Sequence, residues 1–280
     1  MKPVDYAHIV LRGFGQVMLQ NNIWTGILFL VGILANSGLM AFAAILGNIT
    51  GSLAAYILKY DRRQILDGLY GFNGTLVGIA GAVFFQPSLL LTASIMVFSA
   101  ISTVAMHFML GRGWKPFTFP FVASAWAMVA AGSVIGLKAV AAAPNAALAF
   151  DVVSAAGMSV GQVMFQASVI TGAAFLLGLA ASSWLAAAAG LASGMIGSLT
   201  GLLMGLPVQS VNLGIYGFNA VLCGIALSDG KKSAKFTLLA IALAVALTQG
   251  FILTGIPALT APFVFAAWIA LAAREMRHGA

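Results

Sequence analysis

Residues 64–82 read Gln-Ile-Leu-Asp-Gly-Leu-Tyr-Gly-Phe-Asn-Gly-Thr-Leu-Val-Gly-Ile-Ala-Gly-Ala, and residues 209–227 read Gln-Ser-Val-Asn-Leu-Gly-Ile-Tyr-Gly-Phe-Asn-Ala-Val-Leu-Cys-Gly-Ile-Ala-Leu. Both stretches contain Tyr-Gly-Phe-Asn, which begins at Tyr70 and returns at Tyr216, an offset of 216 − 70 = 146 residues. The offset is close to half of the 280-residue chain. The sequence therefore predicts one half-molecule that is encoded twice.

Two further pairs of motifs extend the repeat over most of the chain. Gly-Gln-Val-Met at 15–18 returns at 161–164 with the same offset, and Phe-Thr-Phe-Pro-Phe at 117–121 corresponds to Leu-Thr-Ala-Pro-Phe at 259–263 with an offset of 142. Membrane proteins built from repeats commonly place their substrate site at the repeat interface. The polar residues that recur in both halves are therefore the candidates for a site.

The composition indicates a membrane protein. Hydrophobic residues make up 61% of the chain and charged residues 7%, and the mean hydropathy is +1.05. Soluble domains carry about 25% charged residues, whereas apolar runs of about 17–25 residues can cross a bilayer as helices. The sequence predicts ten such spans, near residues 24–41, 42–58, 64–85, 89–110, 118–137, 170–186, 188–205, 209–227, 236–255 and 260–273.

Two shorter apolar segments, near 6–20 and 154–167, open the two halves of the chain. Because they contain Gln and Gly among apolar residues, we interpret them as re-entrant half-helices, which are tolerated where protein or a cavity covers the backbone. Five spans per repeat is an odd number, so the second repeat enters the membrane from the opposite side. The predicted fold is an all-α integral membrane protein with two inverted repeats of five transmembrane helices, each with a re-entrant half-helix; the repeats are residues 1–145 and 146–280.

The basic residues predict the orientation. With ten spans, only Lys138 of the 13 Lys and Arg residues falls on one face, so 13 − 1 = 12 fall on the other. Cytoplasmic loops carry the excess of Lys and Arg, so we expect both termini in the cytoplasm and the connector at 138–153 on the opposite side. The net charge of +7 is then a topology signal, aided by anionic lipid, and it does not indicate a nucleic-acid partner.

The sequence excludes the common enzyme classes. It has no His-Glu-x-x-His, no Cys and His cluster with metal-ligand spacing, and no P-loop, so we expect neither a metal nor a cofactor. Gly157-Met-Ser-Val-Gly161 matches the nucleophile-elbow pattern, but that motif needs a strand–turn–helix context with His and acid partners. The single cysteine, Cys223, lies inside a predicted span and is expected to pack there.

The acidic residues favour passive permeation. Asp67 falls in the first turn of the predicted span 64–85, where a carboxylate meets the helix dipole favourably. The other acidic residues map to termini or loops; they are Asp5, Asp61, Asp151, Asp229 and Glu275. Gradient-coupled transporters usually need ionisable groups at mid-depth, and the sequence offers none there.

Four kinds of side chain recur in both halves and could line a pore. Phe72 with Leu76, and Phe218 with Leu222, are spaced i and i+4, so each pair shares one helix face. Gln16 and Gln162 lie on the two half-helices, and Thr118 and Thr260 each stand two residues before a proline, as suits a helix start. The alternative is that the Phe and Leu residues face lipid or pack, and that the Thr residues are N-caps.

The residues that recur resemble those of the urea transporter family. The similar segments are Leu11–Val17, Asn21-Asn22 with Thr25–Ile27, Gly68–Gly78 and the Phe-Thr-Phe-Pro-Phe box; they follow in order, and motifs of the family occur in both halves. The resemblance implies two inverted five-span repeats with re-entrant helices. It also implies a homotrimer with one pore per subunit, passive channel-like urea flux, and a place in the inner membrane of a bacterium.

The resemblance also implies roles for the recurring residues. Phe72 with Leu76 and Phe218 with Leu222 match the residues of the slot, Gln16 and Gln162 match the polar ends of the constriction, and Thr118 and Thr260 match the threonines at mid-pore. The family often has an aromatic residue three positions after each polar end, where Phe165 fits and Leu19 does not. Asn21-Asn22 corresponds to Ala167-Ser168, so it is not repeated.

A slot of this kind suits urea, which is planar, neutral and strongly hydrated. The Gln and Thr side chains would replace hydrogen bonds to water, each of which costs about 1–3 kcal/mol if it is left unmade. Alternatives within transport are a channel for ammonia, a short amide or water, and a gradient-coupled secondary transporter. An intramembrane enzyme or a purely structural membrane protein is disfavoured, since matched polar residues in hydrocarbon tend to be functional.

Overall fold

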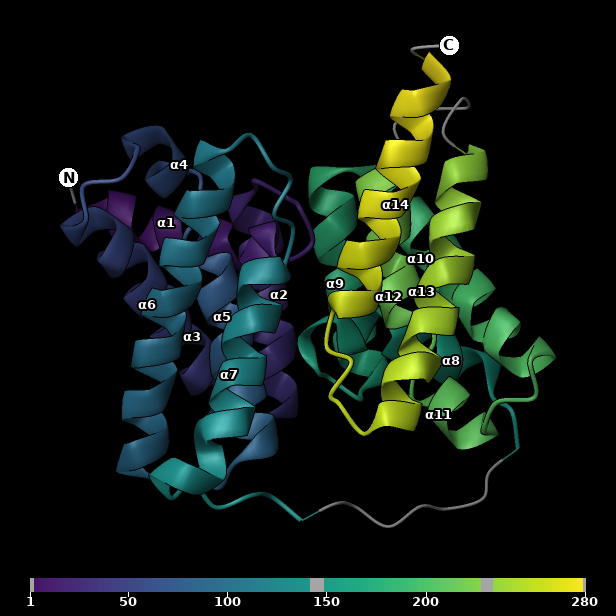
Figure 1. Ribbon diagram of the computed structural model, residues 1–280, viewed down its shortest axis with the longest axis horizontal. Coiled ribbons are helices and arrows are strands. Elements are labelled where there is room, and N and C mark those ends of the chain that lie inside the picture. Colours follow the sequence, from purple (N-terminus) through teal and green to yellow (C-terminus); the bar gives the residue numbers. More distant parts are fainter. Residues whose placement is uncertain (1–2, 142–148, 228–233, 279–280) are drawn as a thin grey trace. The chain divides into compact units, whose positions relative to one another are not determined.

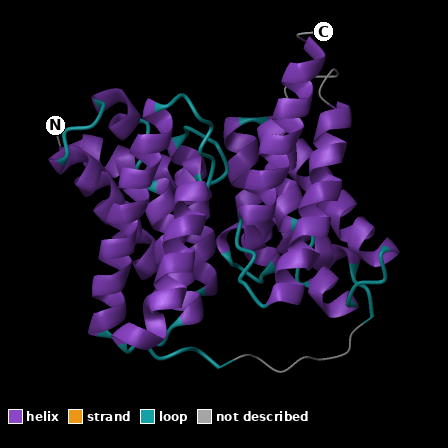
Figure 2. Ribbon diagram, in the orientation of Figure 1, coloured by secondary structure: helices purple, strands orange, loops and turns teal. Residues whose placement is uncertain are grey.

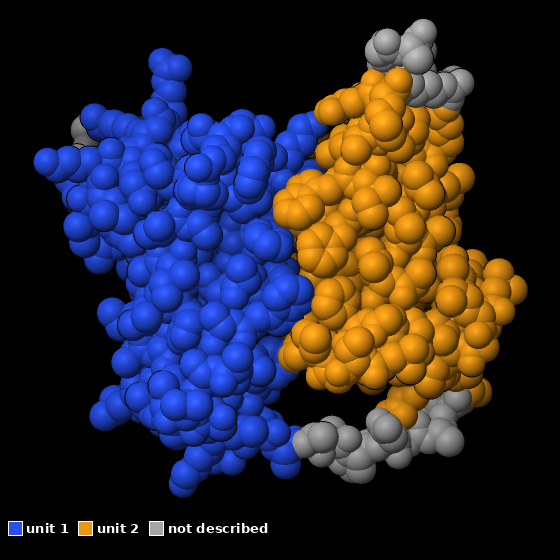
Figure 3. Space-filling view, viewed as in Figure 1, with its two compact units in different colours: residues 1–143 blue, residues 144–280 orange. Residues whose placement is uncertain are grey.

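The computed structural model describes residues 3–141, 149–227 and 234–278. Over these residues the chain is helical, and they contain no β-strand beyond an isolated bridge between Phe85 and Ala139 (Figure 2). The chain divides into two compact units, Met1–Ala143 and Pro144–Ala280, which we call the first and second unit (Figure 3). Part of the predicted connector at 138–153 lies outside the described residues. Lys2, Asp229, Lys231 and Lys232 also lie outside them.

The described helices of the two units follow one another in the same order (Figure 1). The first unit contains α1 (Pro3–Gln16), α2 (Ile23–Asn36), α3 (Gly38–Ile57), α4 (Arg62–Leu66), α5 (Phe72–Phe84), α6 (Leu89–Gly111) and α7 (Phe119–Ile135). The second unit contains α8 (Val152–Gly161) with the 3-10 turn η1 (Gln162–Met164), α9 (Val169–Ser182), α10 (Trp184–Leu203), α11 (Val208–Asn212), α12 (Phe218–Leu227), α13 (Ala234–Thr254) and α14 (Ala261–His278).

The helix starts repeat because the capping residues repeat. The Ser37 hydroxyl accepts the Met40 amide at the start of α3 (3.2 Å), and the Ser183 hydroxyl accepts the Ala186 amide at the start of α10 (3.2 Å). Ser and Asn are favoured at this position because they accept amide hydrogens that have no partner within the helix. The pattern of caps is therefore a local sequence feature that places the same helices in both units.

Each unit begins with a short helix that is followed by a tight turn. In both turns a residue takes a left-handed conformation, Leu19 (φ 62°) and Phe165 (φ 60°). The Gly161 carbonyl accepts the Gln166 amide at 3.1 Å, and a Cβ atom on Gly161 would lie 2.4 Å from the Gln166 carbonyl oxygen. The turn after α8 therefore requires glycine, and the chain bends by 72° between the α8–η1 segment and α9.

Span length agrees with the sequence for some helices only. Among the described residues four helices are long and apolar enough to cross a membrane, namely α3, α6, α10 and α13, and the bent α8–η1–α9 segment is a fifth candidate. Four other apolar helices have 10–17 residues; they are α2, α5, α7 and α12. The all-helical membrane fold is thus confirmed, whereas the count of ten spans stays a prediction.

Two predicted spans are interrupted. The structure replaces the continuous helix expected at 64–85 by α4, a turn and α5, and it replaces 209–227 by α11, a turn and α12. The turns contain Gly68 (φ 74°) and Gly214 (φ 73°), and a Cβ atom on either would lie 2.4 Å from a backbone nitrogen of the half-helix of its own unit. Each helix is interrupted at this glycine because the chain there contacts the backbone of α1 or α8, and a side chain would not fit between them.

The small residues of α3 and α5 let these two helices touch through their backbones. A Cβ atom on Gly47 would lie 2.0 Å from the Gly74 carbonyl oxygen, and one on Gly74 would lie 2.2 Å from the Gly47 carbonyl oxygen. Gly51 and Gly78 make similarly close approaches. Small residues at such spacings let transmembrane helices approach closely, whereas Gly205 has no such role, since it lies in a left-handed turn with no atom near its Cβ position.

Candidate functional site

The end of α1 forms a polar cluster with the turn that follows α4. The Gln16 amide nitrogen donates to the Asp67 carbonyl oxygen (3.0 Å), and the Asn21 amide nitrogen donates to the Asp67 carboxylate (2.9 Å). Arg12 donates to the Leu66 carbonyl oxygen (2.9 Å) and lies 4.0 Å from the Asp67 carboxylate. These contacts hold Gln16 against the turn that leads into Tyr-Gly-Phe-Asn.

The predicted place of Asp67 is wrong. Asp67 is the C-cap of the short helix α4, so its carboxylate does not meet the N-terminal dipole of a longer helix. It is half-exposed and accepts a hydrogen bond from Asn21 instead. Because helices α4 and α5 are separate, a residue that the sequence places in a first helical turn lies in a loop.

The second unit has no charged counterpart of this cluster. The residues 146 positions after Arg12, Asn21 and Asp67 are Met158, Ala167 and Leu213. Gln162, which corresponds to Gln16, is half-buried at the junction of α8 and η1. The two predicted polar ends therefore occupy the same place in each unit but have different surroundings.

The predicted slot residues open the helix that follows the Tyr-Gly motif in each unit. Phe72 is the first residue of α5 and Phe218 the first of α12, and Leu76 and Leu222 lie one turn later. All four side chains are buried. The structure thus brings each Phe and Leu pair onto one face of a helix within its own unit.

Phe165 and Leu19 occupy the same left-handed position of the two half-helix turns, three residues after Gln162 and Gln16. Both side chains are half-buried. The two ends of the predicted slot were expected to differ, with Phe165 at one end and Leu19 at the other. The structure places these two residues at matching positions of their units.

The two predicted pore threonines lie at helix starts, but Thr118 does not act as an ordinary cap. Thr118 is the residue before α7, and its side chain makes no capping hydrogen bond. The Phe121 amide donates instead to the Asn73 side-chain oxygen (3.1 Å). In the second unit Thr260 precedes α14, and the Phe263 amide donates to the Asn219 side-chain oxygen (3.2 Å). Thr118 thus holds the N-cap position of α7, as the alternative expects, but it does not cap the helix through its hydroxyl.

Asn73 and Asn219 are two further candidate residues, which were not predicted from the sequence. They end the two copies of Tyr-Gly-Phe-Asn, and their exposed fractions are 1% and 0%. A buried amide in an apolar helix has to find hydrogen-bond partners, so its recurrence at an offset of 146 residues was the available signal. The partner amides could not be foreseen, since they lie more than 40 residues away along the chain.

Ser159, the middle residue of the nucleophile-elbow match, is a packing residue. Its hydroxyl donates to the Ala155 carbonyl oxygen of its own helix and lies 3.2 Å from the Ser198 hydroxyl. At the matching place in the first unit Asn48 fills the space, because a Cβ atom on Gly13 would lie 2.6 Å from the Asn48 amide nitrogen. The described residues also contain no cluster of three or more His, Cys, Asp or Glu that could hold a metal.

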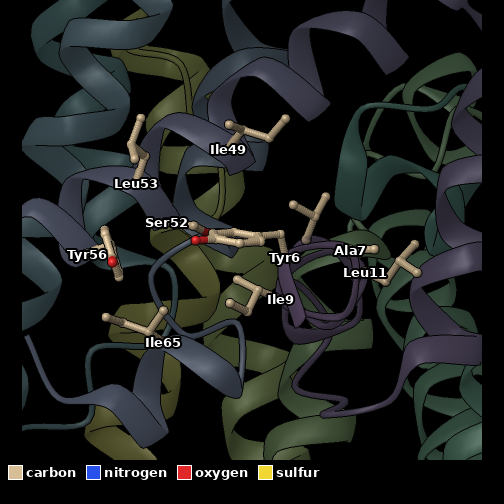
Figure 4. Close-up of a pocket in the computed structure, with 10 residues that line it drawn as sticks. Tyr6, Ala7, Ile9, Leu11, Ile49, Ser52, Leu53, Tyr56 and Ile65 are labelled. Carbon is tan, nitrogen blue, oxygen red and sulfur yellow. The ribbon is translucent and has the colours of Figure 1, made fainter. Parts of the chain in front are cut away.

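A separate pocket of about 500 Å³ lies in the first unit (Figure 4). It is lined by α1, α3 and Ile65, and Tyr6 and Tyr56 are among its exposed side chains. No predicted site residue lines it, and its lining is almost entirely apolar. This pocket does not fit a strongly hydrated solute such as urea.

Comparison with known proteins agrees with the recurring motifs. The family described as "Urea transporter" matches residues 7–275. Urea transporter 1 of Mus musculus is 30% identical over 270 residues, which cover 89% of this chain and 70% of the mouse protein. Urea transporter 1 of Ovis aries is 29% identical over 291 residues, which cover 94% of this chain and 76% of the sheep protein. The chain therefore belongs to the urea transporter family, and it is an all-helical, multi-pass membrane transporter of urea and not an enzyme.

Proposed function

We propose that this protein conducts urea passively through a narrow slot at the interface of two inverted repeats. The observation that carries the proposal is that both units hold the same kinds of side chain at matching places in the same helix order. The slot residues are Gln16, Phe72, Leu76, Thr118, Gln162, Phe165, Phe218, Leu222 and Thr260.

The chemistry of these side chains fits a flat, neutral solute. The Phe and Leu side chains would admit urea edge-on and displace water from its two faces. The Gln and Thr oxygens would accept hydrogen bonds from its amino groups, and the Gln16 oxygen suits this role because the Gln16 nitrogen already donates to Asp67. Ions would face a large desolvation cost between the Phe and Leu side chains, since none of the proposed slot residues carries a charge. Binding stays weak enough for release, as conduction requires.

The proposal includes the arrangement in the membrane. Ten spans, two of them interrupted next to the slot, would place both termini in the cytoplasm of a bacterium, with the protein in the inner membrane. The half-helices α1 and α8 would enter the membrane without crossing it, because a turn with a left-handed residue, Leu19 or Phe165, follows each of them. Three subunits, each with its own pore and surrounded by lipid, would form a homotrimer.

Passive flux is the first testable consequence. Liposomes that contain the purified protein should equilibrate urea rapidly without ATP, sodium or a proton gradient, since none of the proposed slot residues carries a carboxylate. Stopped-flow light scattering measures this rate directly, and empty liposomes give the background. A urea flux that collapses when the sodium or proton gradient is removed would favour a secondary transporter and overturn the passive channel.

The choice among small neutral solutes belongs to the same measurement. Ammonia, water and short amides also fit between Phe and Leu side chains, and one or more of them could share the slot. Rates for urea, formamide, acetamide and glycerol, measured on the same liposomes, rank the solutes. A rate for acetamide or glycerol above that for urea would contradict the proposed preference.

The proposed topology is tested by labelling. Cysteines introduced at Lys59 and Lys231 should react with an impermeant maleimide from the cytoplasmic side, and one at Lys138 from the opposite side, because the positive-inside rule places these loops there. The native Cys223 is fully buried and serves as the unlabelled background. Labelling of Lys59→Cys and Lys231→Cys from opposite faces would contradict the ten-span arrangement.

A further inference from the structure

The two asparagines that end the Tyr-Gly-Phe-Asn motifs each join three helices of their unit. We propose that Asn73 and Asn219 are positioning residues, which hold each threonine-bearing helix start in register with the phenylalanine at the start of the neighbouring helix. The inference rests on the proposed slot, because it assigns to the asparagines the task of keeping the side chains of that slot in place.

The start of α7 is capped by a residue of a neighbouring helix. The first amides of a helix have no partner within it, and a side chain usually caps them. In α7 the first three residues are Phe119, Pro120 and Phe121, and proline carries no N–H. The Phe121 amide is therefore the one that an N-cap would serve, and it donates to the Asn73 oxygen at 3.1 Å. The cap comes from α5, so it links two helices where an ordinary cap serves one.

The second unit repeats this link. In α14 the first three residues are Ala261, Pro262 and Phe263, and the Phe263 amide donates to the Asn219 oxygen at 3.2 Å. The same proline position and the same acceptor atom thus occur in both units. Because a buried amide left without a partner is strongly destabilising, this contact fixes the distance between α12 and α14.

The amide nitrogens of the two asparagines tie in a third helix. Asn73 donates to the Met106 sulfur on α6 at 3.7 Å, and Asn219 donates to the Thr248 hydroxyl on α13 at 3.3 Å. Asn219 also donates to the Leu259 carbonyl oxygen at 3.3 Å, directly before Thr260. In the second unit the amide therefore holds the threonine from both sides, through Leu259 and through Phe263.

The backbone before each threonine is in a conformation that needs such support. Phe117 (φ 47°) and Leu259 (φ 48°) are left-handed, which is strained for a bulky residue without a glycine's freedom. Strain of this kind persists only where the surroundings hold it, and it tends to occur at functional sites. That both units keep it next to the threonine supports a role in placing the hydroxyl.

The position of Asn73 completes the link to the slot. It directly follows Phe72 and lies three residues before Leu76 on α5. Helices α5 and α7 pack against each other in the first unit (Figure 1). If the hydrogen bond to Phe121 were lost, Thr118 could shift relative to the Phe and Leu pair without any change in the pair itself.

A double-mutant cycle tests the role. Asn73→Leu keeps the approximate volume and removes the acceptor, and we expect it to lower urea flux per folded protein by about 5- to 100-fold. When Thr118→Val is already present, Asn73→Leu should lower flux by less than about 3-fold further, because no hydroxyl remains to be positioned. Stopped-flow rates for the wild type, both single variants and the double variant give the coupling.

A matched control separates positioning from stability. Asn212 is also a buried asparagine, which accepts the Asp151 amide (3.0 Å) and donates to the Ala149 carbonyl oxygen (2.8 Å). Asn212→Leu should lower the melting temperature and leave the urea rate of the folded protein within about 2-fold of the wild type. Equal flux losses in Asn212→Leu and Asn73→Leu would overturn the proposal, as would fully multiplicative losses in the cycle.

The remaining outcomes are also decisive. If Asn73→Leu does not fold, the Asn219→Leu and Thr260→Val cycle takes its place, and failure of both asparagine variants to fold would show that the amides serve folding alone. Gradient-dependent flux of the wild type would overturn the passive channel and leave the coupling between Asn73 and Thr118 measurable. Passive wild-type flux with a multiplicative cycle would overturn only the positioning role.

Discussion

Replacing Thr118 or Thr260 with Val should lower urea flux by about 5- to 150-fold while the protein still folds. Valine has nearly the volume of threonine but no hydroxyl, and one lost hydrogen bond in a dry slot costs about 1–3 kcal/mol. If that site limits the rate, the cost converts to this range of fold-changes. Folding should survive because Asn73, and not Thr118, caps the start of α7.

The measurement is the urea rate per folded protein in liposomes, and Thr50→Val is the matched control. The Thr50 hydroxyl donates to the Leu46 carbonyl oxygen within its own helix (2.8 Å), so its loss should leave the rate unchanged. The two pore variants should show similar losses, because the repeat places both threonines at equivalent helix starts. A wild-type rate in folded Thr118→Val and Thr260→Val would remove the threonines from the pore.

Much of the helical framework could be predicted from the sequence because its signals are local. The spans expected at 42–58, 89–110 and 188–205 lie within a few residues of α3, α6 and α10. Long apolar runs and serine caps such as Ser37 and Ser183 fix these helices without help from distant residues. The recurrence of Tyr-Gly-Phe-Asn likewise predicted a second unit with the same helix order.

The interruptions at 67–71 and 213–217 could not be predicted, because they depend on contacts between distant segments. From the sequence alone, the apolar run that contains Gly68 predicts a continuous helix. The structure shows that the backbone of α1 passes where a Cβ atom on Gly68 would lie. A second example is a pair of contacting residues that differs between the units: the first unit has Gly13 and Asn48, and the second unit has Ser159 and Gly194 at the corresponding positions. Each residue alone is unremarkable in the sequence, and only packing shows that the two pairs fill the same space.

The candidate site, too, could be predicted only in part from the sequence. The types of its side chains and their places at helix starts could be read from the repeat, while the hydrogen bonds of Gln16 to Asp67 and of Asn73 to Phe121 join residues 51 and 48 positions apart. The facing of Phe72 and Phe218 across one slot stays a prediction. It rests on the inverted repeat, and a change in solute preference is the observation that tests it.

Replacing Phe72 or Phe218 with Ala should widen the slot and allow larger amides to pass. Truncation of a buried phenylalanine removes one wall, so the rate for acetamide relative to urea should rise by about 10-fold or more if the wall contributes about 1.4 kcal/mol to discrimination. Each phenylalanine is the first residue of a helix in its own unit. The next residue is the asparagine that accepts a hydrogen bond from the start of α7 or α14. Comparing urea, formamide and acetamide rates for each variant measures the change.

Phe29→Ala is the matched control, because Phe29 is fully buried on α2 and is not one of the proposed slot residues. Its loss should cost about 3–5 kcal/mol of stability without a change in the order of the solutes. If the slot phenylalanines only pack, Phe72→Ala should behave like Phe29→Ala, with a lower melting temperature and an unaltered preference. A folded Phe72→Ala protein that still ranks urea above acetamide by the wild-type ratio would contradict the slot, since a wall that can be removed without admitting a larger solute does not face the solute.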